Sequence, residues 1–234
     1  MLAFVGMPLM VDGKLYNVAA ALNKGKVLGF TTKTFLPNYS EFYEMRQFTP
    51  GPREAREILF EGEKVPFGPC LLFQSTVMEG LVVGAEICED VWAVEPPSIR
   101  EALAGATIIV NCSASDETVG KDVYRRELIG GQSARLIAGY VYANAGEGES
   151  TTDLVFGGHN VIAENGVILK ESKRFVNNII YSEIDIRRLL SERRKNTTFQ
   201  NGGETLPRIL FEVNEEDTKL TRVFSQNPFV PQDE

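Results

Sequence analysis

Histidine and cysteine are both scarce in this chain of 234 residues. The single histidine, His159, would have to carry any histidine-based triad or metal site alone, and its context Gly-Gly-His-Asn favours a strand or turn residue over a ligand. The three cysteines, Cys70, Cys88 and Cys112, form neither an even disulfide framework nor a zinc-type spacing. We therefore expect no metal site, and we expect a reducing, cytoplasmic compartment.

Positive charge and long apolar runs are also limited. The chain holds 24 Lys and Arg against 32 Asp and Glu, a net charge of -8, whereas nucleic-acid and anionic-membrane partners favour basic patches. No apolar run is long enough to span a bilayer, and the N-terminal MLAFVGMPLMVDGK lacks the basic region of a signal peptide. We expect neither nucleic acid nor membrane as a partner. The same stretch is typical of a strand that the chain enters midway, which predicts further sequence upstream.

The pattern of apolar residues predicts an α/β layered domain with much antiparallel pairing. The expected helices are 98–106 and 122–140, with apolar residues at helical spacing, and 184–195, with Asp185 near its start and basic residues near its end, as the helix dipole favours. The runs TIIVN and GLVVG are continuously apolar, as in strands buried on both faces. The expected strands are 2–10, 15–22, 27–36, 70–76, 80–88, 106–114, 140–146, 157–164, 166–172 and 178–185.

One thiol lies at the end of a predicted buried strand, in GAEICEDVW. Cys88 is either a small core residue, as most free cysteines are, or a nucleophile presented at a strand-to-loop turn. Its neighbours Glu86, Glu89 and Asp90 argue against the second interpretation, because nearby carboxylates suppress the thiolate. A nucleophilic Cys88 therefore needs a cation from elsewhere in the fold.

Lys33, in GFTTKTFLPN, is a candidate for that cation. Its aromatic neighbours Phe30 and Phe35 predict partial burial, which is costly for a lysine unless its charge is paired. The alternative is a lysine on an edge strand, where its charge would block aggregation.

Several motifs in a fixed order resemble one family. KTFLPNYSEFYEMRQFTPG, then ICEDVW and NCSAS, resemble the nitrilase (carbon–nitrogen hydrolase) superfamily. With YVYANAGEGESTTDLVFGGHN and ENGVILKESKRF, the chain is similar to the amidotransferase (glutaminase) domain of glutamine-dependent NAD synthetases, from about Leu2 to about Phe199. The resemblance implies a four-layer αββα sandwich, incomplete at its N-terminus, in residues 1–200. It also implies an extended arm in residues 201–234, ending in NPFVPQDE, toward an absent synthetase domain.

The resemblance also implies a Glu–Lys–Cys triad, with Lys33 as the lysine and Cys88 as the nucleophile. The ammonium of Lys33 would offset the carboxylates near the thiol and stabilise an oxyanion. The triad glutamate falls before the strand that opens this chain, and no glutamate precedes Lys33. We therefore expect a fragment that is inactive, or nearly so, alone. A second glutamate of the superfamily, which positions the lysine and the substrate, matches Glu44.

Four further positions match residues that contact glutamine in the family: Tyr39, Glu89, Ser115 and Lys121. By the resemblance, Glu89 would accept from the α-ammonium and Lys121 would pair with the α-carboxylate as a point charge. On residue type alone, Ser115 also suits a turn and Lys121 a solvated helix start. The implied glutaminase step uses no cofactor. ATP and magnesium would belong to the synthetase domain, which would convert nicotinic acid adenine dinucleotide to NAD with the released ammonia.

Two other functions stay open at this point. The chain could be a stand-alone amidase of the same superfamily that acts on another small amide. It could also be a non-catalytic assembly module, since superfamily members commonly form homo-oligomers.

Overall fold

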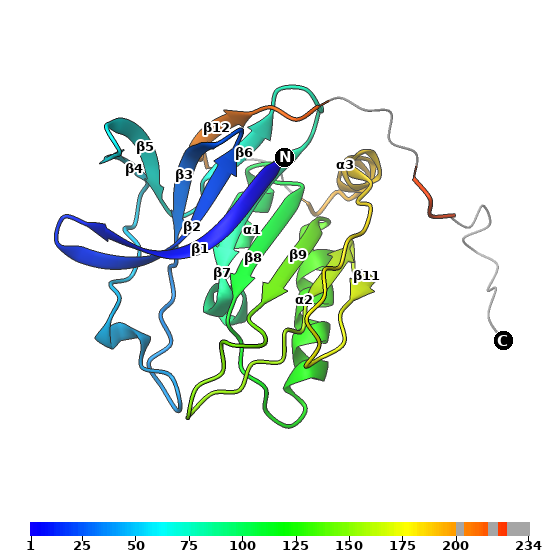
Figure 1. The fold of residues 1–234 in the computed structure, drawn as a ribbon. Helices are drawn as coiled ribbons and strands as arrows, with labels where there is room; N and C mark the ends of the chain where they lie inside the picture. Colours follow the sequence, from blue (N-terminus) through cyan, green and yellow to red (C-terminus); the bar gives the residue numbers. More distant parts are fainter. Residues whose placement is uncertain (200–203, 215–219, 224–234) are drawn as a thin grey trace.

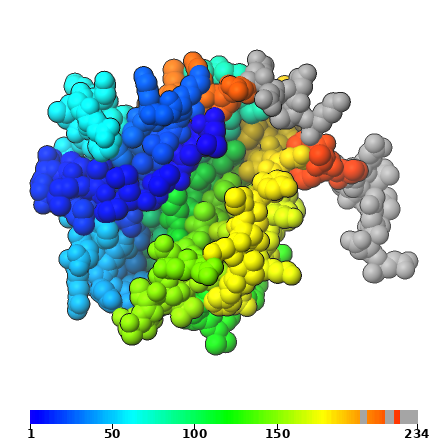
Figure 2. Space-filling model, viewed as in Figure 1, coloured from blue at the N-terminus to red at the C-terminus, as the bar shows by residue number. Residues whose placement is uncertain are grey.

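The structure is a computed structural model that describes residues 1–199, 204–214 and 220–223, and two β-sheets form its centre (Figure 1). The smaller sheet has the strand order β1-β2-β3-β5-β4. Its strands are β1 (Leu2–Val11), β2 (Lys14–Asn23), β3 (Lys26–Thr32), β4 (Arg56–Phe60) and β5 (Glu63–Gly68). Turns at Asp12-Gly13 and Lys24-Gly25, all at positive φ, connect the first three strands as antiparallel hairpins. Figure 2 shows β1 on the surface below the cyan β4–β5 hairpin.

The larger sheet has the strand order β11-β10-β9-β8-β7-β6-β12. Its strands are β6 (Leu72–Ser75), β7 (Val82–Ile87), β8 (Ile108–Ser113), β9 (Gly139–Asn144), β10 (Val161–Glu164), β11 (Val167–Glu171) and β12 (Arg208–Phe211). The central strands β7, β8 and β9 are parallel, so their carboxyl ends meet at one edge of the sheet. Every residue of β7 is buried, as its continuous apolar run predicts.

Helices and the smaller sheet cover opposite faces of the larger sheet. Helix α1 (Pro97–Leu103) packs on β7, and α2 (Lys121–Leu136) packs on β9, β10 and β11. Ile109, Ile129 and Tyr140 belong to the core between these helices and the sheet. The core between the two sheets includes Phe73 and Phe4, whose rings meet edge to face at 5.3 Å. The predicted layered α/β architecture is therefore present, as a helix layer and two sheet layers in the described part of the chain.

The predicted elements agree with the structure in most places and differ in three. The run 178–185 forms no strand, and helix α3 (Ile186–Lys195) follows it directly. The β4–β5 hairpin was not among the predicted strands. Finally, the expected arm 201–234 contributes β12, which pairs in parallel with β6 and buries Phe211, so the packed unit extends past residue 200. The tail NPFVPQDE lies outside the described residues.

Candidate active site

Cys88 follows β7 at the sheet edge where the parallel strands end, and it opens a short 3₁₀ helix, η2 (Cys88–Trp92). Its φ is 49°, in the left-handed region that costs a non-glycine residue about 1–2 kcal/mol. The backbone N–H of Cys88 donates to Asn111 Oδ1 at 2.9 Å, which fixes the turn from the β8 side. The residue therefore turns sharply out of the sheet instead of continuing the strand.

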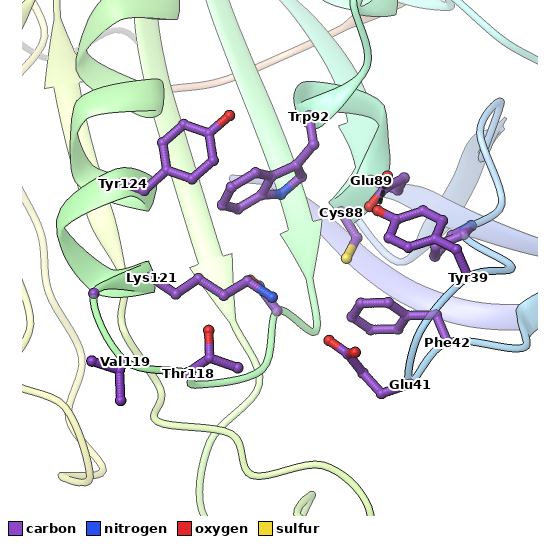
Figure 3. A pocket seen from close by; sticks show the side chains of 13 residues that line it. Tyr39, Glu41, Phe42, Cys88, Glu89, Trp92, Thr118, Val119, Lys121 and Tyr124 are labelled. Carbon is purple, nitrogen blue, oxygen red and sulfur yellow. Dashed lines mark hydrogen bonds between the residues drawn. The ribbon is translucent and has the colours of Figure 1, made fainter.

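The side chain of Cys88 faces a pocket of about 370 Å³. Figure 3 shows the sulfur between Trp92 and Lys121 on one side and Tyr39 and Phe42 on the other. The walls come from three segments: the loop after β3, η2, and the turn that leads into α2. The lining residues are Pro37, Tyr39, Glu41, Phe42, Cys88, Glu89, Trp92, Ser115, Thr118, Val119, Gly120, Lys121 and Tyr124.

Lys33 lies just after β3 and is buried, with 3% of its surface exposed. Its ammonium contacts Glu44 Oε2, and the other oxygen of Glu44 accepts from Asn17 Nδ2 at 2.7 Å. Burial excludes the interpretation of Lys33 as an exposed edge-strand charge. The lysine and Glu44, both predicted site residues, form one ion pair inside the protein.

Asp90 joins the segment of Lys33 to the segment of Cys88. Its Oδ1 accepts from the amides of Thr34 and Phe35 at 3.0 and 2.8 Å, and its Oδ2 accepts from the amide of Ile87 at 2.9 Å. One carboxylate thus binds the residues next to Lys33 and the residue before Cys88. The two segments therefore lie side by side although they are far apart in the sequence.

The carboxylates beside Cys88 in the sequence point in different directions. The side chain of Glu86 in β7 accepts hydrogen bonds from the hydroxyl of Tyr140 and from the backbone N–H of Ser98 in α1. Burial raises the pKa of Glu86. Burial also raises the pKa of Asp90 to about 7, against the opposing effect of its amide hydrogen bonds. Glu89 is the member of this group that lines the pocket. The expectation of three carboxylates around the thiol is therefore too simple, because two of them bond elsewhere.

All four predicted substrate contacts line the pocket. Tyr39 donates its hydroxyl proton to Glu89 Oε1 at 2.6 Å. The ammonium of Lys121 contacts Asp116 and lies 5.5 Å from the ring centre of Phe42. Lys121 is therefore a partly enclosed cation and not a solvated helix-start charge.

Ser115 is fixed by its backbone. Its N–H donates to Asn144 Oδ1 at 2.7 Å, and its carbonyl accepts from Asn144 Nδ2 at 2.9 Å. Behind it, the fully buried Arg125 donates to the carbonyl of Asp116 at 2.9 Å and to His159 Nδ1 at 3.0 Å. Because arginine only donates, His159 Nδ1 must accept, and its Nε2 then donates to Glu171 at 2.7 Å.

Sequence reasoning missed several residues of this region. Asp116, Arg125 and Asn144 order the wall that carries Ser115 and Lys121, and only their sequence proximity to NCSAS and YVYANAG pointed to them. Trp92 is also a wall of the pocket. Within the described ranges, no group of three or more His, Cys, Asp or Glu side chains is arranged to hold a metal ion, and no helix is long and apolar enough to cross a membrane.

The fold and the pocket define a layered α/β protein with a cysteine at the carboxyl end of a central parallel strand, and Asp90 ties that segment to the one that carries a buried lysine paired with a glutamate. A family model described as carbon-nitrogen hydrolase matches residues 1–194. The chain therefore belongs to the carbon–nitrogen hydrolase family.

Curated relatives of this chain within the family share one name. The chain is 43% identical over 240 residues to the glutamine-dependent NAD(+) synthetase of Mycobacterium tuberculosis strain H37Rv, and the match covers 98% of this chain and 35% of that protein. The protein of the same name from Mycobacterium leprae is also 43% identical, with the same coverage. The chain thus spans about a third of the length of these curated relatives and resembles their glutaminase region.

Solved structures agree with this assignment of the fold. A crystal structure of a glutamine-dependent NAD(+) synthetase from Cytophaga hutchinsonii aligns with a TM-score of 0.65 and 32% identity, over 74% of this chain and 28% of that one. A carbon-nitrogen hydrolase from Helicobacter pylori G27 aligns with a TM-score of 0.65 and 20% identity, over 83% of this chain and 66% of that one. The second likeness concerns the fold alone.

Proposed function

We propose that this chain provides the glutamine-hydrolysing site of a glutamine-dependent NAD synthetase, with Cys88 as the nucleophile. The observation that carries the proposal is the pocket, in which Cys88 shares the walls with a cation, Lys121, and with the carboxylates Glu41 and Glu89. Glutamine is a zwitterion, so its α-carboxylate suits Lys121 and its α-ammonium suits Glu89. The names of the relatives support the same substrate.

The proposed reaction is an acyl transfer through a thioester. The thiolate of Cys88 attacks the side-chain carbonyl of glutamine, and the C–N bond breaks once the nitrogen has taken up a proton, so that ammonia leaves. Water then attacks the γ-glutamyl thioester, and glutamate and the thiol are released. No oxidant, metal or cofactor enters this balance.

Lys33 and Glu44 have separate roles in the proposal. The ammonium of Lys33 favours the thiolate and stabilises the negative oxygen of the tetrahedral intermediate. Glu44 holds that ammonium through one oxygen, while Asn17 holds the other oxygen. A fixed lysine is worth more than a mobile one, because less reorganisation is needed during the reaction.

The proton carrier is the part of the triad without a match among these residues. We propose that a glutamate outside residues 1–234 serves as general acid and base, so that the chain alone forms the thiol adduct but turns glutamine over slowly. We further propose that the ammonia is used by an ATP- and magnesium-dependent synthetase domain of the same polypeptide, in a homo-oligomer.

The test uses 6-diazo-5-oxo-L-norleucine, an electrophilic glutamine analogue, with peptide mass spectrometry of all three cysteines. We expect selective labelling of Cys88 over Cys70 and Cys112, with protection by L-glutamine and none by D-glutamine. A Cys88→Ser variant is the control and should stay unlabelled. Equal labelling of the three cysteines, or none in a folded protein, would contradict the proposal and favour an assembly module.

A further inference from the structure

A chain of buried hydrogen bonds leads away from Cys88 on the side opposite the pocket. The N–H of Cys88 donates to Asn111 Oδ1 at 2.9 Å, and Asn111 Nδ2 donates to the hydroxyl of Tyr140 at 3.1 Å. That hydroxyl donates to Glu86 Oε1 at 2.5 Å, and Glu86 Oε2 accepts from the backbone N–H of Ser98 at 3.0 Å. This series of hydrogen bonds crosses β7, β8 and β9 and ends at helix α1.

Every side chain in this series is almost fully enclosed. Asn111 and Glu86 are each 1% exposed, and Tyr140 is 0% exposed. Buried polar groups are costly unless they are bonded, so a carboxyl, a phenol and an amide among Ile109, Ile129 and other apolar residues need a reason to be there. Fold stability alone would be served as well by apolar side chains of similar volume.

The reason is visible at the Cys88 end of the series. Cys88 has a left-handed φ of 49°, and a strained residue persists only when its surroundings determine its conformation. The Asn111 oxygen holds the amide of this residue. Tyr140 leaves that oxygen a single orientation, because the phenol donates its one proton to Glu86 and can then only accept, from Asn111 Nδ2.

We propose that Asn111 is a positioning residue for the nucleophile, held in register by Tyr140 and Glu86, and that these groups set the direction of the Cys88 side chain into the pocket that it shares with Lys121. This inference rests on the proposed function of Cys88. None of the three side chains lines the pocket, so each acts through the backbone of Cys88 and not on the substrate.

The test is the pH dependence of Cys88 alkylation by iodoacetamide, a small reagent that needs no glutamine site. The variants are Asn111→Leu, which removes both hydrogen bonds and keeps the number and branching of the side-chain heavy atoms, Tyr140→Phe, which removes only the phenol oxygen, and the double variant. The matched control is Thr107→Val, at the other end of β8, which loses a buried hydroxyl bonded to the Gly80 carbonyl at 2.7 Å.

The charged and titratable groups that surround the thiol come from several elements and stay the same in every variant except for the phenol itself. We expect the midpoint of the rate profile to rise by about one pH unit in Asn111→Leu, a tenfold loss of rate below the midpoint. Tyr140→Phe should give about half that rise, and the double variant should match Asn111→Leu alone, because Tyr140 acts through Asn111. The groups that line the pocket with the thiol are Tyr39 and Glu41 in the loop after β3, Glu89 in η2, and Lys121 and Tyr124 in α2. Tyr142 in β9 interacts electrostatically with Cys88, Asp90 in η2 binds the amide of Ile87, and Lys33 with Glu44 lies in the segment after β3 that Asp90 also binds.

Two outcomes would overturn the inference. The first is that the midpoints of Asn111→Leu and Tyr140→Phe are no higher than the midpoint of Thr107→Val, when the three variants lose similar thermal stability. The hydrogen-bonded network would then be merely structural. The other is an additive double variant, since Tyr140 would then act independently of Asn111. Labelling by the glutamine analogue is followed in parallel. Its absence in the unmodified protein, with the midpoint shifts as expected, would refute the glutamine assignment and leave the positioning role.

Discussion

Substitution of Asp90 by asparagine tests the connection between the lysine and cysteine segments. The carboxylate accepts three backbone N–H groups, two on Oδ1 and one on Oδ2. An asparagine has one oxygen and one NH₂ group at these positions, so in either orientation at least one backbone N–H faces another donor. The variant keeps the size of the side chain and loses part of the link between Lys33 and Cys88.

The effect on stability depends on pH, and its sign follows from the raised pKa of Asp90. The ordinary value is 3.8 and burial raises the pKa to about 7, so between these values the folded protein keeps a proton that the unfolded chain has lost. The contribution of Asp90 to stability is therefore most favourable below pH 3.8, falls as pH rises, and becomes constant above about 7. Between pH 5 and pH 8 the contribution of Asp90 to the free energy of unfolding falls by about 2.5 kcal/mol. Asparagine does not titrate, and it loses about 1–3 kcal/mol at all pH values for the unpaired amide.

The assay is urea denaturation of both proteins at pH 5 and pH 8. We expect the asparagine variant to be less stable at pH 5, and we expect its deficit to shrink by about 2.5 kcal/mol at pH 8. Glu86 and Glu101 titrate in both proteins and cancel only in part, because the charge of Asp90 interacts with both of them. If the two proteins differ in their free energy of unfolding by the same amount at both pH values, within about 0.5 kcal/mol, the reasoning is refuted. Asp90 would then be ionised at both pH values in the folded and the unfolded state. Cys88 labelling by the glutamine analogue should also slow at both pH values, because Lys33 is less well held.

Three further substitutions test other parts of the argument. Lys33→Met leaves Glu44 without its cation, so we expect a stability loss of about 3 kcal/mol and at least tenfold slower labelling of Cys88 by the glutamine analogue; an unchanged rate would exclude Lys33 from the chemistry. Lys121→Met removes the ammonium that pairs with the α-carboxylate of glutamine, an interaction of about 1.4 kcal/mol, so protection of Cys88 by L-glutamine should weaken about tenfold. Equal protection in the variant would remove Lys121 from substrate binding. Arg193→Met removes three hydrogen bonds to backbone carbonyls, so the urea midpoint should fall with a cost of about 2–4 kcal/mol while the folded protein labels at the original rate; slower labelling would show that α3 influences the site.

Local sequence patterns were sufficient where strands lie in the middle of a sheet. The runs GLVVG and TIIVN predicted β7 and β8 as strands of the sheet interior; β7 is buried on both faces, whereas β8 is buried on one face and half-buried on the other. The patterns failed where pairing is decided far along the chain. β12 has the sequence RILF, and its partner β6 lies more than a hundred residues earlier. No local window contains that information.

The run 178–185 shows the opposite failure. NIIYSEID has the composition of a strand, yet no neighbouring strand pairs with it, and Ile179 and Tyr181 are 90% and 85% exposed. β-propensity describes how well a residue fits a half-buried pleated surface, and it has no effect on a segment that no sheet accepts. The prediction was reasonable for the residues and wrong for the position.

The candidate site was predicted at the level of residue types and not of their contacts. The four substrate positions line one pocket with Cys88, and Lys33 pairs with Glu44, but neither Lys33 nor Glu44 is among the residues that line that pocket. The function of Asp90 could not be read from sequence, because its partners are backbone amides, which every residue but proline has. The acidic motif therefore suggested repulsion of a thiolate, whereas one of its carboxylates is a structural link.

The two contacts that fix Cys88 come from different layers of the protein. Asn111 belongs to the larger sheet, whereas Asp90 binds the amides of Thr34 and Phe35, which follow the smaller sheet. The segments that carry Cys88 and Lys33 can therefore reach their arrangement only after the two sheets have packed through the core that contains Phe4 and Phe73. Because this arrangement also holds Cys88 at a left-handed φ of 49°, we expect Cys88 to leave that strained conformation once the two sheets no longer pack against each other.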